Sequence, residues 1–341
     1  MNKNRKIFFS IIIPTSTYST YLFKECLPAL NRQKYKGFEV ILLPDNSSKK
    51  DAQIKKKYSW LDVVATKNIQ SPAKKRDIGA KHAKGKYLAF IDDDAYPATD
   101  WLESAYEHLK NPALLAVCGP GMTPANTNEW EKVFNELLTS RFGSGKLQYR
   151  FCPMDARFVR DFPSMNLIVR KTTFKKTGGF GTFYWPGEDS KLCNAITYNN
   201  PQSILYTPDI VVFHHHRSSP SKFLRQHGQY GYHRGLFFVH GDLNSREAIY
   251  LAPTIFLFYL AALTIGGLLA LYNEIEIRTL IYASVPLYMY LGMISYITIR
   301  AMQRGKGVIF GIRLATIAVA MHLVYGWMFV VGVIDGTIHD K

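Results

Sequence analysis

Cysteine is scarce in this sequence, and the few cysteines that occur are scattered. Four are present among 341 residues, and no two of them are spaced as a CxxC pair. This pattern argues against a secreted fold held together by disulfides and against a zinc ribbon. We therefore expect reduced thiols at Cys26, Cys118, Cys152 and Cys193.

Acidic residues are the second shortage. The 26 Asp and Glu are outnumbered by 42 Lys and Arg, which gives a formal net charge of +16. Residues 250–341 contain six basic and four acidic residues, so nearly all of the excess lies in residues 1–249. Such a charge is typical of proteins that bind nucleic acid or an anionic membrane surface. No nucleic-acid-binding motif accompanies the charge, so we expect membrane lipids and no nucleic acid as partners.

Three long apolar runs occur towards the C-terminal end. Each has the roughly 20 residues that a membrane-spanning helix needs. A helix in a soluble core is rarely apolar on every face for so long. We therefore predict an integral membrane protein whose transmembrane region covers residues 250–334. Its spans are expected at residues 250–272, 279–299 and 308–334.

The two loops between these runs predict an orientation. Residues 273–278 carry two acids and one arginine, whereas residues 300–307 carry three basic residues and no acid. The positive-inside rule places the second loop in the cytoplasm. With three spans, residues 1–249 are then cytoplasmic and the C-terminus is outside.

Apolar segments alternate with helical patterns in the N-terminal part of the chain. The run Ile7–Ile13 ends at Pro14 and has no signal-peptide cleavage site, so we interpret it as a buried strand. The alternation predicts a doubly wound α/β sheet, which binds ligands at the carboxyl ends of its strands. Residues 119–162 indicate only mixed helix and loop. Expected strands are 7–13, 38–43, 61–65 and 87–91, and expected helices are 21–32, 49–57, 72–84 and 101–109.

Three consecutive carboxylates, Asp92–Asp94, follow the strand expected at residues 87–91. Adjacent carboxylates repel one another unless a cation lies between them. Their oxygens suit Mg²⁺ or Mn²⁺, and alternate residues of an extended segment point to the same side. Asp92 and Asp94 are therefore candidate metal ligands, and an acidic turn or helix cap is the alternative.

Two further clusters are candidates for chemistry. Glu188 and Asp189 follow a turn at Trp185–Gly187, where they could also be a charge pair favoured by a helix dipole. The triplet His214–His216 follows an expected strand at residues 210–213. Alternation allows either His214 and His216 together or His215 alone to face a metal site, and a structural role is the alternative.

Several segments, in the same order along the chain, resemble family 2 glycosyltransferases of the GT-A fold. The resemblance covers about residues 7–240. It implies a GT-A domain at residues 1–240, which the loop charges place in the cytoplasm, with a basic juxtamembrane segment at 217–240. It also implies an inverting transferase that uses a nucleotide-diphosphate sugar and Mn²⁺ or Mg²⁺. The segments are Ser10–Thr15, Val40–Ser47, Arg76–Asp94, Gly178–Phe180 and Gly187–Asp189.

The resemblance also implies roles for single residues on the donor side. Asp45 would accept a hydrogen bond from the base, which favours uracil or thymine. Asp94 would bind the metal together with Asp92, which could contact the ribose instead. His215 is favoured to complete the metal site, with His214 and His216 as alternatives. Further residues implied to bind the nucleotide sugar are Pro14, Thr15, Arg76, Asp93, Arg225 and Arg234.

On the acceptor side the resemblance implies that Asp189 is the catalytic base. Glu188 would bind acceptor hydroxyls or support Asp189. One position departs from the family pattern, because Asp77 stands where an Asn often follows the arginine. A helix-capping carboxylate is the simple interpretation of Asp77.

The leading hypothesis is therefore a membrane-anchored hexosyltransferase of cell-envelope polysaccharide biosynthesis. Its expected acceptor is a lipid-linked or membrane-proximal glycan, and oligomer formation is left open. A polyprenyl-phosphate sugar transferase, which makes a lipid-phosphate sugar, is the second hypothesis. A third, from another class, is a non-catalytic basic membrane-binding protein.

Overall fold

A computed structural model describes residues 6–181, 184 and 186–339. The chain forms two compact units. The first contains the described residues up to Asn126 together with Tyr149–His215. The second contains Thr127–Gln148 and the chain from His216 onwards.

The first unit is built on an eight-stranded sheet. Its strands are β1 (Phe9–Pro14), β2 (Phe38–Leu43), β3 (Leu61–Val63), β4 (Tyr87–Phe90), β6 (Ala116–Cys118), β8 (Arg157–Phe158), β9 (Leu167–Arg170) and β10 (Ile204–Tyr206). Their order is β3-β2-β1-β4-β9-β6-β10-β8. All six residues of β1 are buried, as an apolar central strand requires. β1 to β4 are parallel, whereas β9 runs antiparallel to β4 and β6, so the sheet is mixed.

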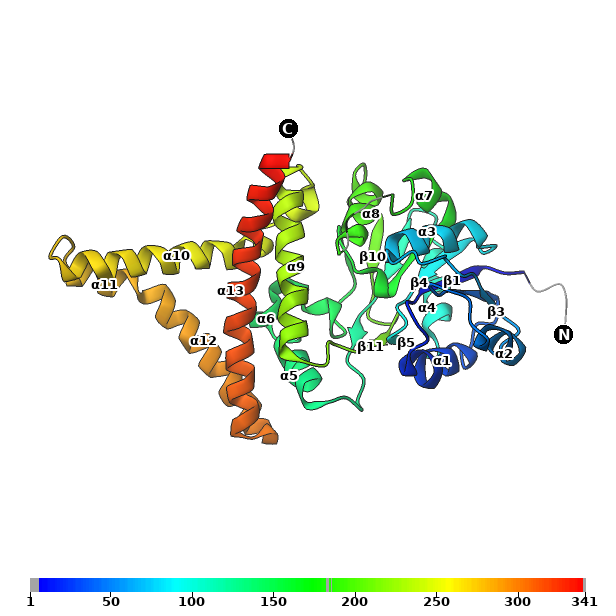
Figure 1. Ribbon diagram of the computed structural model, residues 1–341, viewed down its shortest axis with the longest axis horizontal. Helices are drawn as coiled ribbons and strands as arrows, with labels where there is room; N and C mark the ends of the chain where they lie inside the picture. Colours follow the sequence, from blue (N-terminus) through cyan, green and yellow to red (C-terminus); the bar gives the residue numbers. More distant parts are fainter. Residues whose placement is uncertain (1–5, 182–183, 185, 340–341) are drawn as a thin grey trace. The chain divides into compact units, whose positions relative to one another are not determined.

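Helices cover both faces of this sheet, with α3 on one side and α1 and α2 on the other (Figure 1). α3 begins at Pro72 after Ser71, whose side chain accepts a hydrogen bond from the Lys74 amide. A Cβ on Gly79 would lie only 2.7 Å from Ile12, so α3 packs closely on β1. The helices are α1 (Leu27–Asn31, after a π-helical turn at Leu22–Cys26), α2 (Lys50–Lys57), α3 (Pro72–His82), α4 (Trp101–Leu109), α7 (Lys171–Lys176) and α8 (Glu188–Thr197).

A three-stranded sheet completes the first unit. It contains β5 (Ala95–Pro97), β7 (Gly121–Met122) and β11 (Val212–His214), in the order β5-β11-β7. β11 runs antiparallel to β5, and His214 pairs with Ala95. This register brings the end of β11 to the chain that follows β4.

The second unit is helical. Three stretches, Ala248–Leu271, Ile277–Lys306 and Val308–Ile338, are long and apolar enough to cross a membrane. α9 lies against α13 so closely that a Cβ on Gly235 would be 2.1 Å from the Phe329 carbonyl oxygen. The helices are α5 (Glu129–Leu138), α6 (Arg141–Ser144), α9 (Pro220–Val239), α10 (Ala248–Leu271), α11 (Ile277–Ala283), α12 (Val285–Ala301) and α13 (Val308–His339).

The predicted α/β fold class followed by three apolar helices is confirmed, but two boundaries differ. The second apolar stretch breaks at Ser284, before Pro286, and the Leu287 amide donates to the hydroxyl of Tyr259 at 3.1 Å. α5, α6 and α9 group with the apolar helices and not with the sheet. The reason is apolar packing, since the rings of Phe134 and Phe223 stack at 4.0 Å.

Candidate active site

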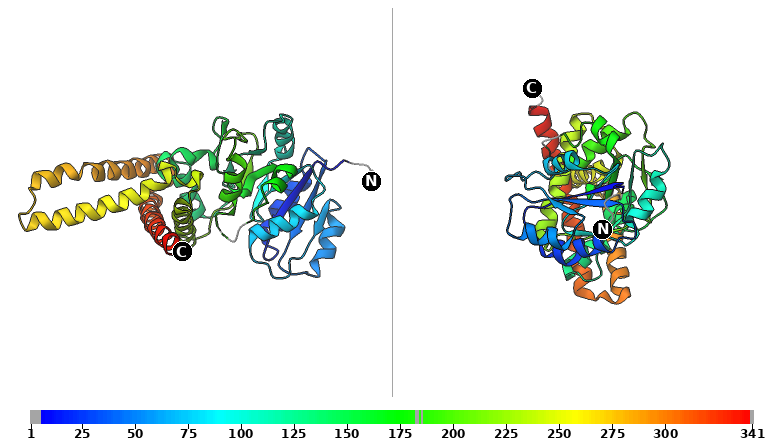
Figure 2. Two further views of the ribbon diagram at one scale, coloured as in Figure 1. Left: turned by 90° about the horizontal axis from the view of Figure 1, so that it is seen from above. Right: turned by 90° about the vertical axis from the view of Figure 1, so that its right-hand side faces the viewer.

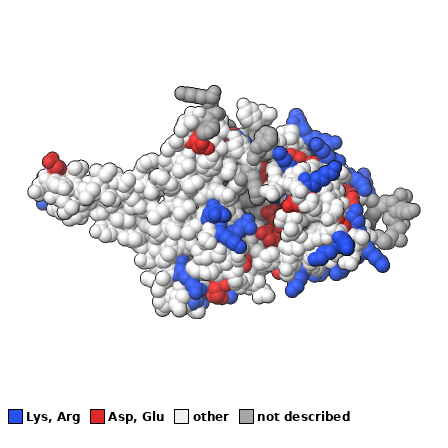
Figure 3. Space-filling model, viewed as in Figure 1, with Lys and Arg blue, Asp and Glu red and all other residues white. Residues whose placement is uncertain are grey.

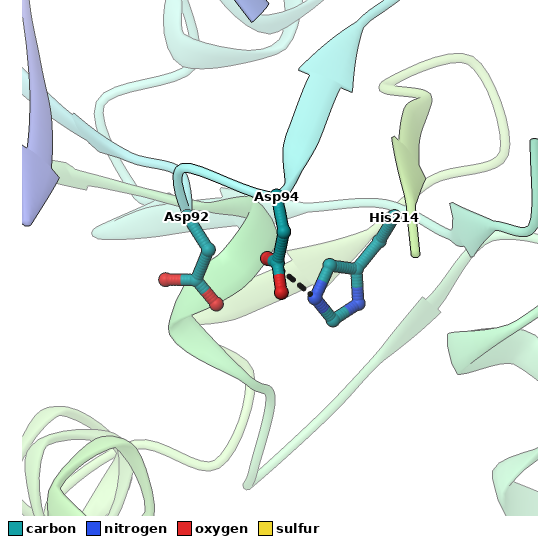
Figure 4. Close-up of side chains that lie close together, drawn as sticks. All are labelled: Asp92, Asp94 and His214. Carbon is teal, nitrogen blue, oxygen red and sulfur yellow. Dashed lines mark ion pairs between the residues drawn. The ribbon is translucent and has the colours of Figure 1, made fainter. Parts of the chain in front are cut away.

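Asp92, Asp94 and His214 form a half-buried cluster at one edge of the sheet. Each offers one ligand atom, and these atoms lie within 4.8 Å of one another (Figure 4). Asp94 Oδ1 and His214 Nε2 are 3.2 Å apart. The carboxylates follow β4, and the pairing of β11 with β5 delivers the imidazole. Two carboxylates and one imidazole are a donor set that fits Mn²⁺ and accommodates Mg²⁺.

His215, which the sequence favoured as the third metal ligand, does not lie beside the Asp94 carboxylate. Its side chain turns the opposite way, with Nε2 2.8 Å from Glu25 Oε2 and the ring stacked on Tyr21 at 4.1 Å. Its backbone N–H donates to the Asp94 carbonyl oxygen at 3.2 Å. Successive residues of an extended strand face opposite sides, so His214 and His215 cannot both face the carboxylates. His216 begins the second segment of the second unit.

Arg76 links this cluster to the start of α8. The guanidinium is buried, with Nη2 2.6 Å from Asp92 Oδ1 and Nη1 2.8 Å from Glu188 Oε1. It also lies over the ring of Phe180, 5.6 Å from the centroid. From the sequence we expected Arg76 to bind the nucleotide sugar, and the ion pair with Glu188 was not predicted.

Asp189 lies beside Glu188 in the first turn of α8. The amides of Ser164 and Ser190 donate to its two carboxyl oxygens at 3.3 and 2.8 Å. Burial, with the nearby negative charges of Glu188 and Asp161, raises the pKa of Asp189 to about 7. A carboxyl group with such a pKa can gain and lose a proton near neutral pH, as a general base must.

A second group of polar side chains surrounds the end of β1, after Pro14. The buried ammonium group of Lys75 donates to Asp45 and to the Thr15 carbonyl oxygen. The hydroxyl of Thr15 donates to Asp93 Oδ2 at 2.5 Å. Sequence reasoning missed Lys75, although its place in the first turn of a helix beginning at the binding edge could have indicated it. Thr15, Asp45 and Asp93 thus lie in one connected group.

Asp77 does not cap its own helix, as the simple interpretation suggested. Its carboxylate accepts hydrogen bonds from the amides of Phe180 at 2.9 Å and Gly181 at 3.4 Å. Gly179 has φ +73°, and a Cβ there would lie 2.5 Å from Asp77 Oδ1. Asp77 therefore holds the glycine-rich loop whose Phe180 ring lies under Arg76.

Three remaining predictions lie outside this group of residues. Arg225 and Arg234 belong to α9 in the second unit, where Arg225 is exposed. Arg234 is buried, donates to Ser245 Oγ at 3.1 Å and stacks on Tyr250 at 4.1 Å. Their contacts with the diphosphate stay predictions. Trp185, in the predicted turn before Glu188, lies outside the described residues.

A family model for glycosyl transferase family 2 matches residues 10–168. This segment runs from the first strand through the acidic cluster to β9. It contains the predicted residues at the end of β1 and after β4.

Two relatives differ in how much of the chain they match. A Methanococcus voltae protein named dolichyl N-acetyl-alpha-D-glucosaminyl phosphate 3-beta-D-2,3-diacetamido-2,3-dideoxy-beta-D-glucuronosyltransferase is 25% identical over 307 residues, which cover 85% of this chain and 93% of that protein. Pre-mycofactocin glycosyltransferase of Mycobacterium tuberculosis is 26% identical over 171 residues, covering 50% of this chain. The chain matches only 36% of that second relative's length.

One solved structure resembles nearly the whole chain. It is mannosyltransferase PcManGT from Pyrobaculum calidifontis, described in complex with GDP-Man and Mn²⁺. The TM-score is 0.60 at 18% identity, and the match covers 94% of this chain and 88% of that one. This likeness shows the fold.

Proposed function

We propose that the protein transfers a sugar from a nucleotide-diphosphate sugar to a lipid-linked or membrane-proximal glycan, since residues 10–168 match the family model for glycosyl transferase family 2. The anomeric centre is inverted in the proposed reaction. One observation carries the proposal. Arg76 joins the Asp92 carboxylate of a metal-type cluster to Glu188, next to a carboxylate whose pKa is near neutral. A donor site and a base are thereby connected through one buried side chain.

The donor is proposed to bind with Mn²⁺ or Mg²⁺. Asp92, Asp94 and His214 would hold the ion, since their donor atoms suit either metal. When bound, the metal would neutralise charge on the departing diphosphate. The buried positive charge of Arg76 lies next to the Asp92 carboxylate and supports the diphosphate side of the site.

Asp189 is proposed as the base. The acceptor hydroxyl oxygen attacks the anomeric carbon, and its proton passes to the Asp189 carboxylate. The bond between that carbon and the diphosphate oxygen breaks, and the nucleotide diphosphate leaves with the electron pair. Glu188 is bound to Arg76, so its proposed role is to orient Arg76 and to support Asp189.

The nucleotide is proposed to lie at the end of β1, against Pro14 and Thr15. Asp45 would accept a hydrogen bond from an N–H of the base, which favours uracil and hence a UDP-sugar. Lys75 holds the Asp45 carboxylate in place. Asp93 supports the group through its bond with Thr15.

A lipid-linked acceptor is proposed for two reasons. The apolar helices could anchor the protein in a membrane, which favours an acceptor held there. The Methanococcus voltae relative, whose name specifies a dolichyl-linked acceptor, aligns along 93% of its length. The loop charges further support a cytoplasmic catalytic domain.

A binding experiment followed by a transfer assay tests the proposal. Full-length protein in detergent is melted with UDP-, GDP- and dTDP-sugars, with Mn²⁺, Mg²⁺ or EDTA. A bound donor raises the melting temperature by mass action, and EDTA and Asp94→Asn should both abolish the shift. If no nucleotide sugar shifts the wild type, the donor proposal fails and the non-catalytic hypothesis gains. The radiolabelled donor is then offered polyprenyl-linked saccharide or polyprenyl phosphate; transfer only to the latter would support a lipid-phosphate product.

A further inference from the structure

The three apolar stretches of the second unit do not run in one direction. α10 and the α11–α12 stretch lead away from α13 to a common tip, whereas α9 and α13 run side by side (Figures 1 and 2). α10 meets α13 near its own start, where Thr254 Oγ1 donates to the Gly326 carbonyl oxygen at 3.3 Å. α13 therefore lies across the direction of α10.

The amphipathic helix α5 lies against the first half of α13 and the turn before it. The guanidinium of Arg313 lies 5.0 Å from the ring centroid of Trp130 on α5, and Lys306 is 3.6 Å from Glu136 on the same helix. α5 also carries an exposed ion pair, with Lys132 2.7 Å from Glu129. If α13 crossed the hydrocarbon core, α5 and its exposed charges would have to enter the hydrocarbon as well.

α9 lines the second half of α13. A Cβ on Gly231 would lie 2.3 Å from the Tyr325 carbonyl oxygen, and the Tyr232 hydroxyl donates to Asp335. α9 also carries exposed Lys222 and Arg225. Charged side chains are costly in the hydrocarbon, so the α9–α13 pair suits the membrane interface.

The hairpin made by α10 and α11–α12 is less covered by other helices than α13, although α13 is about as apolar as α10. In each of these two helical stretches, 6% of the 18-residue apolar segment is buried inside the protein, against 33% in α13. Charged residues on its visible face gather at the tip (Figure 3). α10, with 24 residues, is about 36 Å long, close to the roughly 30 Å hydrocarbon core. α13, with 32 residues, reaches about 48 Å, which exceeds that thickness.

We propose that only the α10–α12 hairpin crosses the bilayer, and that α13 lies in the membrane interface beside α9. Exposed Ile309, Ile312 and Trp327 of α13 contact the boundary between headgroups and acyl chains. The partner of this surface is the lipid bilayer. Both ends of the hairpin, and the C-terminal end of α13, are then on the side of α9, which replaces the three-span prediction of an outside C-terminus.

Cysteine labelling of the full-length protein tests this topology. Three variants, Lys222→Cys, Glu274→Cys and Thr337→Cys, place an exposed thiol on α9, at the hairpin tip and in the last turn of α13. A membrane-impermeant maleimide is added to intact cells or to inverted vesicles. Labelled peptides are identified by mass spectrometry, so the native thiols are distinguished. Each variant must melt like the wild type in detergent.

The expected result is that Thr337→Cys and Lys222→Cys are labelled from one side and Glu274→Cys from the other. Labelling of Thr337→Cys from the side of Glu274→Cys would establish three spans and overturn the proposal. Labelling of Glu274→Cys from the side of Lys222→Cys would also overturn it, because the hairpin would not cross. Neither outcome bears on the proposed sugar transfer.

Discussion

Arg76 and Glu188 are 112 residues apart in the chain, and their side chains meet at 2.8 Å in a buried ion pair. The other guanidinium nitrogen is 2.6 Å from Asp92. Loss of Arg76 would therefore disturb both the metal-type cluster and the start of α8.

Arg76→Met should destabilise the protein strongly. The substitution leaves Glu188 buried without its cation, and breaking a buried pair from one side costs about 3–5 kcal/mol. Thermal unfolding of the purified protein measures the effect. Arg76→Lys is the matched control, because it keeps the charge but cannot make both contacts, so its midpoint should lie between those of Arg76→Met and wild type. An Arg76→Met midpoint equal to the wild-type value would contradict the structural role of the pair.

His214→Ala should weaken Mn²⁺ binding in the presence of nucleotide by tenfold or more. The imidazole is one of three candidate ligands, whereas His215 is held by Glu25 and Tyr21. Calorimetric titration of the two alanine variants gives the comparison. Removal of the His215 side chain should lower the melting temperature and leave the Mn²⁺ affinity near the wild-type value. A larger loss of Mn²⁺ affinity in His215→Ala than in His214→Ala would contradict the arrangement.

The transfer rate should depend on pH through Asp189. A base acts in its deprotonated form, and the pKa of Asp189 is raised to about 7. The turnover rate kcat should therefore fall about tenfold per pH unit below pH 7 and level off above it. Asp189→Asn should lose about 10²–10⁴-fold in kcat at pH 8 and keep its donor-induced thermal shift. A wild-type rate that is flat between pH 5 and 8 would exclude Asp189 as the base.

The raised pKa of Asp189 also predicts that the ionised form, which is the active base, makes the folded protein less stable. The unfolded Asp189 loses its proton near its ordinary pKa of 3.8, whereas the folded one keeps it until about pH 7. The contribution of Asp189 to stability therefore declines between pH 4 and 7 and stays constant above. Asp189→Asn resembles the neutral acid, so its melting temperature should exceed that of wild type by a margin that grows from pH 4 to 7. Melting curves over this range test the sign, and a margin that shrinks would refute it.

Much of the first unit follows from local patterns. The strand β1, the helix α3 and the carboxylates after β4 were all predicted, because runs of apolar residues and turn residues act over a few neighbouring positions. The alternation of these elements indicated a doubly wound α/β sheet, and the resemblance of several segments to family 2 glycosyltransferases implied the GT-A type of fold. Lys75 was missed because its role depends on Asp45 and Thr15, which come from other parts of the sheet edge.

The choice between His214 and His215 shows where local reasoning ends. Alternation along a strand says that neighbouring residues face opposite sides, but it does not say which side is the site. The register of β11 on β5 decides, since it pairs His214 with Ala95 next to Asp94. Strand register depends on tertiary pairing, which no short segment specifies.

The sequence by itself determined the apolar stretches, the buried strands and the acidic cluster, because each depends on residues that are close together in the chain. Only the tertiary structure decided which histidine joins Asp94, that Arg76 binds Glu188, and that α9 lies along α13. These relationships join positions roughly 100 or more residues apart, and they arise from the packing of whole elements. Hydropathy identifies the helices that could cross a membrane. The charged helices packed against α13 are the reason that we propose a crossing for the α10–α12 hairpin alone.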